Sequence, residues 1–311
     1  MGKIREESIL KNGGEIINIY DPLTGGDKDK VFGDNSEVLF ICTPNNFNVD
    51  YTIRGISSGK HVFCEKPPAM TVEQMNKVII SESLYDKKIC YGFNHRHHTS
   101  IIKMKEIIDN GSLGNVIWMR GRYGKNVDES HFDNWRFDYN KSGGGILMDQ
   151  GIHMLDLFYH LGGDFDIIKS SVSNKFWNIP SVEDNVFAIL ENSKTGVSAS
   201  LHSTMTQWRH IFSLEVFLDG GYLVLNGLKT PSGQYGDEIL TISDKVNKGG
   251  SRSEELNIKY SVDESWDREV GEFFDCIRDN RDITMGNTKD ALNIMTMIDI
   301  IYKNGKNELD K

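Results

Sequence analysis

The first part of the chain alternates short apolar runs with longer amphipathic stretches. Strands are expected where apolar side chains follow one another, at residues 15–20, 37–42, 62–64 and 89–93. Helices are expected over most of residues 1–14, over 48–58 and over 71–85, with Thr71 as an N-cap. Residues 23–33 are rich in glycine and charge and are expected to form a loop. This alternation of strand and helix is typical of a parallel sheet with crossover helices.

The pattern changes after Phe93. Further helices are expected at residues 100–110, 146–161, 265–280 and 288–302. Strands are expected at residues 116–123, 167–172, 184–191, 196–204, 212–218 and 221–225, and turn signals such as Asp219-Gly220-Gly221 indicate antiparallel hairpins. A charged, glycine-containing stretch at 245–255 is expected to be a mobile loop. The pattern therefore predicts an α/β fold with two domains, residues 1–93 and 94–311.

Composition narrows the class of protein. The 311 residues are 38% hydrophobic, which is enough for a sizeable core. A formal net charge of −10 without a compensating basic patch argues against a nucleic-acid partner. The four cysteines contain no CxxC pair and three lie in or beside apolar runs, which is typical of reduced thiols in a cytoplasmic protein. No secretory signal and no apolar run of transmembrane length is present, so no membrane partner is expected.

A lysine follows one of the expected buried strands. The apolar run Val62-Phe63-Cys64 ends at Glu65-Lys66, and Pro67-Pro68 then imposes a rigid turn. A lysine at the carboxyl end of a sheet strand is well placed to point into the crevice where open α/β sheets bind ligands. On position alone, a surface lysine in an ordinary turn is an equally good interpretation.

The second candidate is a glycine-rich entry to a polar helix. Gly143-Gly144-Gly145 precedes Asp149 and His153, which are four residues apart and share a helix face. The glycines are expected to leave backbone N–H groups open to an oxygen-rich ligand. A histidine one turn from a carboxylate suits proton transfer, although a plain polar helix face is the commoner origin of such a pair. No H-E-x-x-H or similar spacing is present, so no metal site is expected.

Together these motifs resemble the glucose–fructose oxidoreductase/inositol dehydrogenase (Gfo/Idh/MocA) family. The resemblance runs from about Glu15 to the C-terminus and rests on motifs in the family's order: Thr43-Pro44-Asn45, Cys64-Glu65-Lys66-Pro67, Gly92-Phe93-Asn94-His95-Arg96, Trp135-Arg136 and the Asp149/His153 helix. It implies an NAD(P)-dependent oxidoreductase acting on a hydroxyl of a sugar, sugar nucleotide or cyclitol. It also implies a Rossmann-like N-terminal domain and a C-terminal α/β domain with a large open, mostly antiparallel sheet. That sheet is often used for oligomer contacts, so a homodimer or homotetramer is expected.

The resemblance also implies roles for three residues. Lys66 matches the motif lysine that contacts the nicotinamide side and the substrate hydroxyl. His153 matches the usual catalytic acid/base, and Asp149 matches the acidic residue that positions the substrate. The implied reaction is hydride transfer to the nicotinamide, with His153 taking the hydroxyl proton and Lys66 stabilising the developing oxyanion.

The resemblance further indicates which residues bind the cofactor and the substrate. Asp21 ends the first expected strand and is predicted to bind the adenosine ribose, which favours NAD because the 2′-phosphate of NADP would meet a like charge; NADP is the alternative. The other cofactor-side positions are Thr43, Asn45, Glu65, Lys66 and Pro67. The predicted substrate-pocket residues, besides Asp149 and His153, are Arg96, Arg122, Trp135 and Arg136, since guanidinium groups suit carboxylates or phosphates. Residues 203–215 are similar to members from surface-polysaccharide pathways, which favours a sugar nucleotide.

The chain departs from the family at its start. It contains no G-x-G-x-x-G motif and no strand before the first helix, so the Rossmann-like domain lacks its first strand and glycine loop. Three interpretations follow. The sequence starts at an internal Met of a longer enzyme; or it is a short form whose sheet has unpaired edges; or it is a non-catalytic member that binds a sugar-like ligand or pairs with another subunit. Retention of Lys66, Asp149 and His153 favours the first.

Overall fold

The structure is a computed structural model, and it describes residues 1–244 and 254–305. The chain divides into two compact units. Unit 1 comprises residues 1–97 and 264–295, and unit 2 comprises residues 98–263 and 296–311. Most of the loop expected at 245–255 lies outside the described residues.

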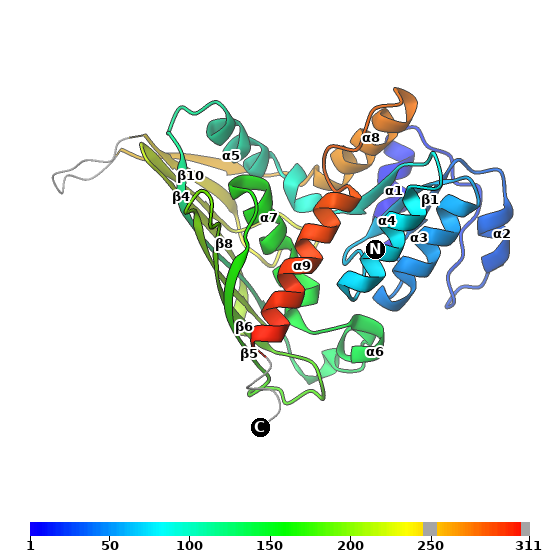
Figure 1. The fold of residues 1–311 in the computed structure, drawn as a ribbon, viewed down its shortest axis with the longest axis horizontal. Helices are drawn as coiled ribbons and strands as arrows, with labels where there is room; N and C mark the ends of the chain where they lie inside the picture. Colours follow the sequence, from blue (N-terminus) through cyan, green and yellow to red (C-terminus); the bar gives the residue numbers. More distant parts are fainter. Residues whose placement is uncertain (245–253, 306–311) are drawn as a thin grey trace. The chain divides into compact units, whose positions relative to one another are not determined.

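Unit 1 is built on a parallel sheet. Its strands β1 (Val38–Ile41), β2 (His61–Glu65) and β3 (Ile89–Gly92) lie in the order β1-β2-β3. The crossovers contain helices α3 (Asn48–Ser57) and α4 (Val72–Glu82), as the sequence predicts. Figure 1 labels β1 and the helices α3 and α4 of this unit. The other elements of unit 1 are α1 (Gly2–Lys11), α2 (Lys28–Gly33), the 3₁₀ turns η1 (Asn45–Phe47) and η2 (Asn94–His97), α8 (Ser265–Arg278) and the first part of α9 (Thr288–Gly305).

Helix α8 belongs to unit 1, whereas the sequence analysis placed all of residues 94–311 in one domain. Its Phe273 is buried, with its ring centroid 5.5 Å from that of Phe63 and 6.2 Å from that of Phe40. These three side chains form an apolar cluster on the parallel sheet. Burial of this helix face is worth several kcal/mol at about 25 cal/mol per Å², which favours the return of the chain to unit 1 at residue 264.

The strand expected at residues 15–20 is not formed. This segment has no ladder in the described sheet, and Ile17 and Ile19 are 46% and 57% exposed. An apolar alternation becomes a strand only when a neighbouring strand satisfies its backbone N–H and C=O groups. The loop expected at 23–33 is also partly wrong, because α2 begins after Asp27, whose carboxylate accepts the N–H groups of Asp29 and Lys30.

Unit 2 contains an eight-stranded sheet in the order β11-β10-β9-β8-β4-β7-β6-β5. The β4–β7 pair is parallel and all other neighbouring pairs are antiparallel. The strands are β4 (Val116–Asn126), β5 (Ile167–Ser173), β6 (Asn185–Glu191), β7 (Ser198–Thr204), β8 (Thr206–Leu218), β9 (Gly221–Asn226), β10 (Glu238–Ser243) and β11 (Leu256–Tyr260). Strands β10 and β11 were not among those expected from the sequence. The predicted α/β class is confirmed, with a Rossmann-like parallel sheet and a large, mostly antiparallel one.

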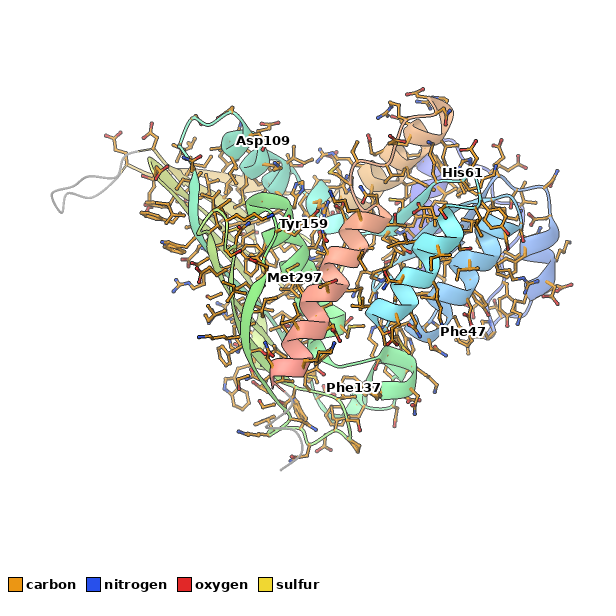
Figure 2. All side chains as sticks on the ribbon, in the orientation of Figure 1. Phe47, His61, Asp109, Phe137, Tyr159 and Met297 are labelled. Carbon is orange, nitrogen blue, oxygen red and sulfur yellow. The ribbon has the colours of Figure 1, made fainter. Side chains whose placement is uncertain are left out.

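Helices cover one face of this large sheet. They are α5 (Thr99–Asp109), the π-helical turn η5 (Leu147–Gly151), α7 (Ile152–Gly162) and the last part of α9. Unit 2 also contains the 3₁₀ turns η3 (Glu129–His131) and η4 (Trp135–Phe137) and the short helix α6 (Tyr139–Ser142). Gly121 on β4 lets α7 approach closely, since a Cβ there would collide with Met154 and Phe158. Tyr159 marks α7 in Figure 2. Among the described helices, none has the length and apolarity needed to cross a membrane.

Candidate functional site

In unit 1, predicted site residues follow neighbouring parallel strands. Thr43 comes shortly after β1, and Lys66 directly follows β2. The strand register pairs Ile41 with Cys64 and Glu65 with Gly92, so these positions lie at one edge of the sheet. This is the edge at which open α/β sheets bind ligands. Lys66 is partly exposed, and its peptide bond to Pro67 is cis.

Asn48 fixes the turn that carries Lys66. Its Nδ2 donates to the carbonyl oxygens of Glu65, at 3.3 Å, and Pro67, at 2.8 Å, on either side of the lysine. Its Oδ1 accepts a hydrogen bond of 3.2 Å from the Thr43 hydroxyl, and the side chain is fully buried. Sequence reasoning missed Asn48; the available signal was a polar residue at the start of the expected helix 48–58.

Glu65 lies in a buried ion-pair network. Arg5 Nε donates to Glu65 Oε1 at 2.7 Å, and Arg5 Nη2 lies 2.7 Å from Glu269 Oε2. Although burial alone would lower it, the two carboxylates hold the pKa of Arg5 above its ordinary value. The guanidinium also lies over the ring of Phe63. The structure thus gives this predicted cofactor-side carboxylate a partner on α1.

Two other predicted residues of unit 1 have partners within the same unit. The exposed Asp21 accepts the N–H of Leu23 at 2.8 Å, which closes a turn. Arg96 is buried, and its Nη1 donates to Asp290 Oδ2 at 2.7 Å. The guanidinium predicted to contact substrate is therefore engaged in a buried ion pair of unit 1. Asn45 is buried after β1.

In unit 2, the expected helix at 146–161 contains a π-helical turn. Asp149 lies within η5, and His153 lies in the first turn of α7 directly after it. His153 is 6% exposed. π-helical turns inside helices occur frequently at functional sites, because the inserted residue redirects neighbouring side chains.

Two cations flank the Asp149 carboxylate. Lys125 Nζ on β4 donates to Oδ2, and Arg136 Nε lies 3.5 Å from Oδ1. The Arg136 guanidinium also lies 4.5 Å from the ring centroid of Trp135. The structure therefore brings together three predicted residues, Asp149, Trp135 and Arg136. Lys125 was missed because the strand was expected to end at residue 123, whereas β4 continues to Asn126.

An aromatic pair, Tyr123 and Tyr235, lies on one side of His153. The His153 ring centroid lies 6.4 Å from that of Tyr123, which in turn lies 5.2 Å from that of Tyr235. Gln150 Nε2 donates to the Tyr235 hydroxyl at 2.6 Å. Burial raises the pKa of both phenols above the ordinary value, so they are neutral hydroxyls at pH 7.

Arg122 lies on the other face of β4. The alternation along the strand buries Tyr123 and exposes Arg122. Burial and the nearby Arg122 charge lower the pKa of His202 to about 4. The structure therefore does not bring Arg122 to the Asp149–His153 cluster, in contrast to the prediction.

The glycine run does not leave the backbone N–H groups open, as expected from sequence. The Glu183 carboxylate accepts the N–H groups of Gly145, at 2.7 Å, and Leu147, at 2.9 Å. The oxygen-rich ligand at this helix entry is therefore a side chain of the protein itself.

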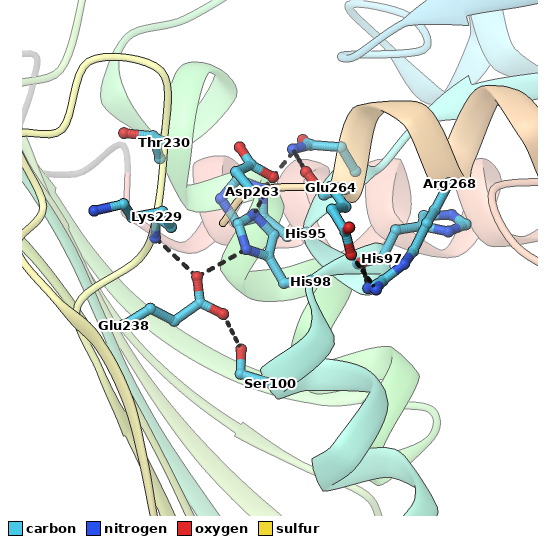
Figure 3. Close-up of polar contacts among 12 residues, drawn as sticks. His95, His97, His98, Ser100, Lys229, Thr230, Glu238, Asp263, Glu264 and Arg268 are labelled. Atoms are coloured by element: carbon cyan, nitrogen blue, oxygen red, sulfur yellow. Dashed lines mark hydrogen bonds and ion pairs between the residues drawn. The ribbon is translucent and has the colours of Figure 1, made fainter. Parts of the chain in front are cut away.

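A second polar cluster of unit 2 surrounds Glu238 (Figure 3). Its Oε2 lies 3.0 Å from His98 Nδ1 and accepts the backbone N–H of Lys229 at 2.8 Å. Its Oε1 accepts the Ser100 hydroxyl at 2.6 Å. These bonds, despite burial, hold the pKa of Glu238 below its ordinary value. The cluster joins the start of α5 to β10.

Comparison with known proteins gives matches in both units. Residues 26–93 match the family described as an oxidoreductase family with an NAD-binding Rossmann fold, and residues 101–224 match the GFO/IDH/MocA C-terminal domain. D-glucoside 3-dehydrogenase of Escherichia coli (strain K12) is 32% identical over 179 residues, which are 52% of this chain and 50% of that protein. Glucose-6-phosphate 3-dehydrogenase of Bacillus subtilis (strain 168) is 30% identical over 194 residues, 57% of this chain and 55% of that protein.

The matched regions thus span about half the length of these curated relatives. Among solved structures, a levoglucosan dehydrogenase in complex with NADH and levoglucosan has a TM-score of 0.80 at 21% identity, covering 99% of this chain and 86% of that one. This similarity shows the fold. The two domain matches, in the order and at the positions where the structure places the parallel and the antiparallel sheet, show that the chain belongs to the Gfo/Idh/MocA family.

Proposed function

We propose that this protein is an NAD-dependent dehydrogenase that oxidises a hydroxyl of a sugar, sugar nucleotide or cyclitol, or catalyses the reverse reduction. The observation that carries the proposal is the position of Asp149 in a π-helical turn directly before His153, with the Asp149 carboxylate bound by Lys125 and Arg136. The sugar dehydrogenases among the relatives support the substrate class.

The carboxyl edge of the parallel sheet fits a nicotinamide cofactor. Thr43, Asn45, Lys66 and Pro67 would hold it, with Glu65 bound to Arg5 behind the motif turn. These residues offer hydroxyl, amide and ammonium groups, which suit a carboxamide and phosphate oxygens. Asp21 is assigned to the adenosine ribose, which favours NAD, with NADP as the alternative. When bound, the cofactor accepts or supplies the hydride.

The chain's own residues handle the proton and the charge. In the oxidation direction, His153 accepts the proton of the substrate hydroxyl as the carbinol C–H bond breaks. The Lys66 ammonium stabilises the negative charge that develops on that oxygen. Asp149, held by Lys125 and Arg136, accepts a hydrogen bond from a second hydroxyl and orients the sugar ring.

Cationic side chains support the proposal of a sugar-nucleotide substrate, and exposed apolar side chains support the proposal of a homo-oligomer. Lys125 and Arg136 suit a carboxylate or phosphate, which fits the sugar nucleotide of a surface-polysaccharide pathway. On the outer face of the large sheet, Phe187 and Ile189 of β6 are 50% and 57% exposed. Large exposed apolar side chains gathered on one sheet face mark an interaction surface, which supports a homo-oligomer.

The test starts with NAD(H) binding to the purified chain, measured by calorimetry, followed by a screen of sugars and sugar nucleotides for NADH formation. Lys66→Ala and His153→Ala are each expected to lower kcat by roughly two decades or more. Near-normal turnover in either variant would remove that residue from the mechanism. Sugar binding without NAD(H) binding or turnover would favour the alternative, a non-catalytic sugar-binding or subunit-pairing protein.

A further inference from the structure

Glu183 is a buried carboxylate for which the proposed chemistry has no direct use. It lies between β5 and β6 and is 2% exposed. Oε2 accepts the N–H of Gly145, while Oε1 accepts both the N–H of Leu147 and, at 2.9 Å, the hydroxyl of Tyr302 on α9. Its backbone carbonyl accepts the N–H of Ile146 at 3.2 Å.

One residue therefore satisfies three successive N–H groups, those of residues 145–147, at the entry to a helix. The first turn of a helix leaves such groups without intrahelical partners, and a typical capping side chain satisfies only one of them. A carboxylate at this position also interacts favourably with the helix dipole. The arrangement holds the first turn more completely than an ordinary N-cap does.

The glycines make this close approach sterically feasible. A Cβ at Gly145 would collide with the Glu183 carbonyl oxygen, and a Cβ at Gly144 would collide with the Tyr302 hydroxyl. The glycine run that looked like a ligand-binding loop is instead shaped to fit Glu183 and Tyr302.

This contact lies directly before the proposed active-site residues. The N–H of Asp149 donates to the carbonyl of Gly145 at 3.1 Å, so Asp149 is bonded to a residue that Glu183 holds. The π-helical turn then leads without interruption into His153. A π turn is less favourable than an α turn, so its position along the helix depends on what fixes its start.

We infer that Glu183, supported by Tyr302, is a positioning residue that fixes the start of the π-helical turn and thereby orients Asp149 and His153. The kinetic consequence rests on the proposed dehydrogenase function; the orienting role does not. Displacement of a reacting group by about 1 Å can lower the rate on the order of 100-fold, so a positioning residue outside the site can control turnover.

Two variants test the contributions of Glu183 and Tyr302 separately. Glu183→Gln keeps the size of the side chain but turns one acceptor oxygen into an NH₂ donor that faces the donors of residue 145, 147 or 302. Tyr302→Phe removes the hydroxyl that donates to Glu183 and leaves the hydrogen bonds from the N–H groups of residues 145 and 147. Leu240→Val, in the fully buried core of β10, serves as a destabilised control remote in sequence and topology from residues 143–153.

The test uses the complete chain without substrate. Amide hydrogen exchange of residues 145–147 and the NMR titration of the His153 imidazole are compared among wild type, the two variants and the control. We expect exchange at residues 145–147 to be about tenfold faster or more in Glu183→Gln, with a shifted His153 titration, and both changes to be smaller in Tyr302→Phe. In turnover assays, kcat is expected to fall about tenfold or more while the KM for NAD is unchanged.

The inference is overturned if Glu183→Gln leaves the exchange at residues 145–147 and the His153 titration as they are in the control. If Glu183→Gln does not fold, Tyr302→Phe decides the matter by the same two readouts, and an unchanged His153 titration overturns the inference. If Glu183→Gln shifts the His153 titration but the wild-type chain oxidises no sugar, the proposed function alone is refuted. Normal turnover in wild type with a variant kcat no lower than the control's would refute the positioning role alone.

Discussion

Arg5 on α1 and Glu65 at the end of β2 form a buried ion pair, with Arg5 Nε 2.7 Å from Glu65 Oε1. Glu269 on α8 is bound by the same guanidinium. The cluster contains one cation and two carboxylates in a site from which water is excluded. It joins both helices directly to β2, the strand that Lys66 follows, so its integrity bears on stability and on the motif turn.

Removing the cation is expected to be costly. Arg5→Met would remove the cation that binds two buried carboxylates, Glu65 and Glu269. Removing one member of a buried ion pair costs about 3–5 kcal/mol in the free energy of unfolding. Urea unfolding measures this change. The matched control is Arg54→Met, whose partner Asp29 is solvent-exposed, and little change is expected there. Equal stability losses in the two variants would contradict the ion-pair assignment.

Asn48 offers a separate test of the motif turn. In Asn48→Ala the carbonyls of Glu65 and Pro67 lose their donor, at a cost of about 1–3 kcal/mol for buried polar groups left unsatisfied. Because these carbonyls flank Lys66, we also expect kcat to fall in assays at a temperature where the variant is fully folded. A folded variant that is destabilised but keeps the wild-type kcat would show that the position of Lys66 does not depend on Asn48.

What could be proposed from sequence depended on the range of the interactions involved. Asp149 and His153 could be proposed because the pair is four residues apart, and Lys66 because the strand end and the prolines are local. Arg5 and Glu183 were missed because their partners lie 60 and 36 to 38 residues away in sequence. Such contacts leave no periodic or local signal.

Two expectations differ from the structure for related reasons: the strand at residues 15–20 and the place of Arg122 beside Asp149 and His153. The apolar alternation at 15–20 is that of a strand, but only a neighbouring strand, which no local pattern reports, makes it one. Arg122 carries the right chemistry, yet the period of two along β4 places it on the opposite face from Tyr123. The fold class, set by the alternation of whole elements, was predictable, whereas the outcome for these positions was decided by tertiary context.

Lys125 is expected to hold Asp149 in the orientation that binds substrate. Lys125→Met removes a charge-assisted hydrogen bond to the carboxylate, and we expect kcat/KM for the sugar to fall about tenfold, mainly through KM. Arg120→Met on the same strand is the control, because Arg120 is exposed and pairs with Glu215. If both variants have the same kcat/KM as wild type, Lys125 has no role in substrate binding.

Asp21 is expected to set the choice of cofactor. Asp21→Ala removes the negative charge that would repel a 2′-phosphate, so binding of NAD should weaken and discrimination against NADP should relax. The ratio of kcat/KM for the two cofactors measures this effect. An unchanged ratio would mean that the ribose is held by other residues.

The Glu238 cluster predicts a pH dependence of stability. Because its pKa in the folded chain lies below the ordinary value of 4.5, ionised Glu238 contributes stability that is fully present above pH 4.5. That contribution is lost as the pH falls through the lower pKa of the folded state. Glu238→Gln should therefore be less stable than wild type at pH 7, because its amide cannot accept all the bonds from His98, Ser100 and Lys229.

The free energies of unfolding of Glu238→Gln and wild type should become more similar as the pH falls below 4.5. Wild type then loses the negative charge at residue 238, which the variant lacks at every pH. Urea unfolding at a series of pH values from 7 down to 3 checks this, with Glu215→Gln on β8 as a control for the loss of one partly exposed carboxylate. A gap between the two unfolding free energies that stays constant across this range would show that the ionisation of Glu238 is not coupled to folding. In that case the bonds from His98 and Ser100 would stabilise the fold independently of the charge on Glu238. Loss of stability in acid would then arise from the protonation of other carboxylates.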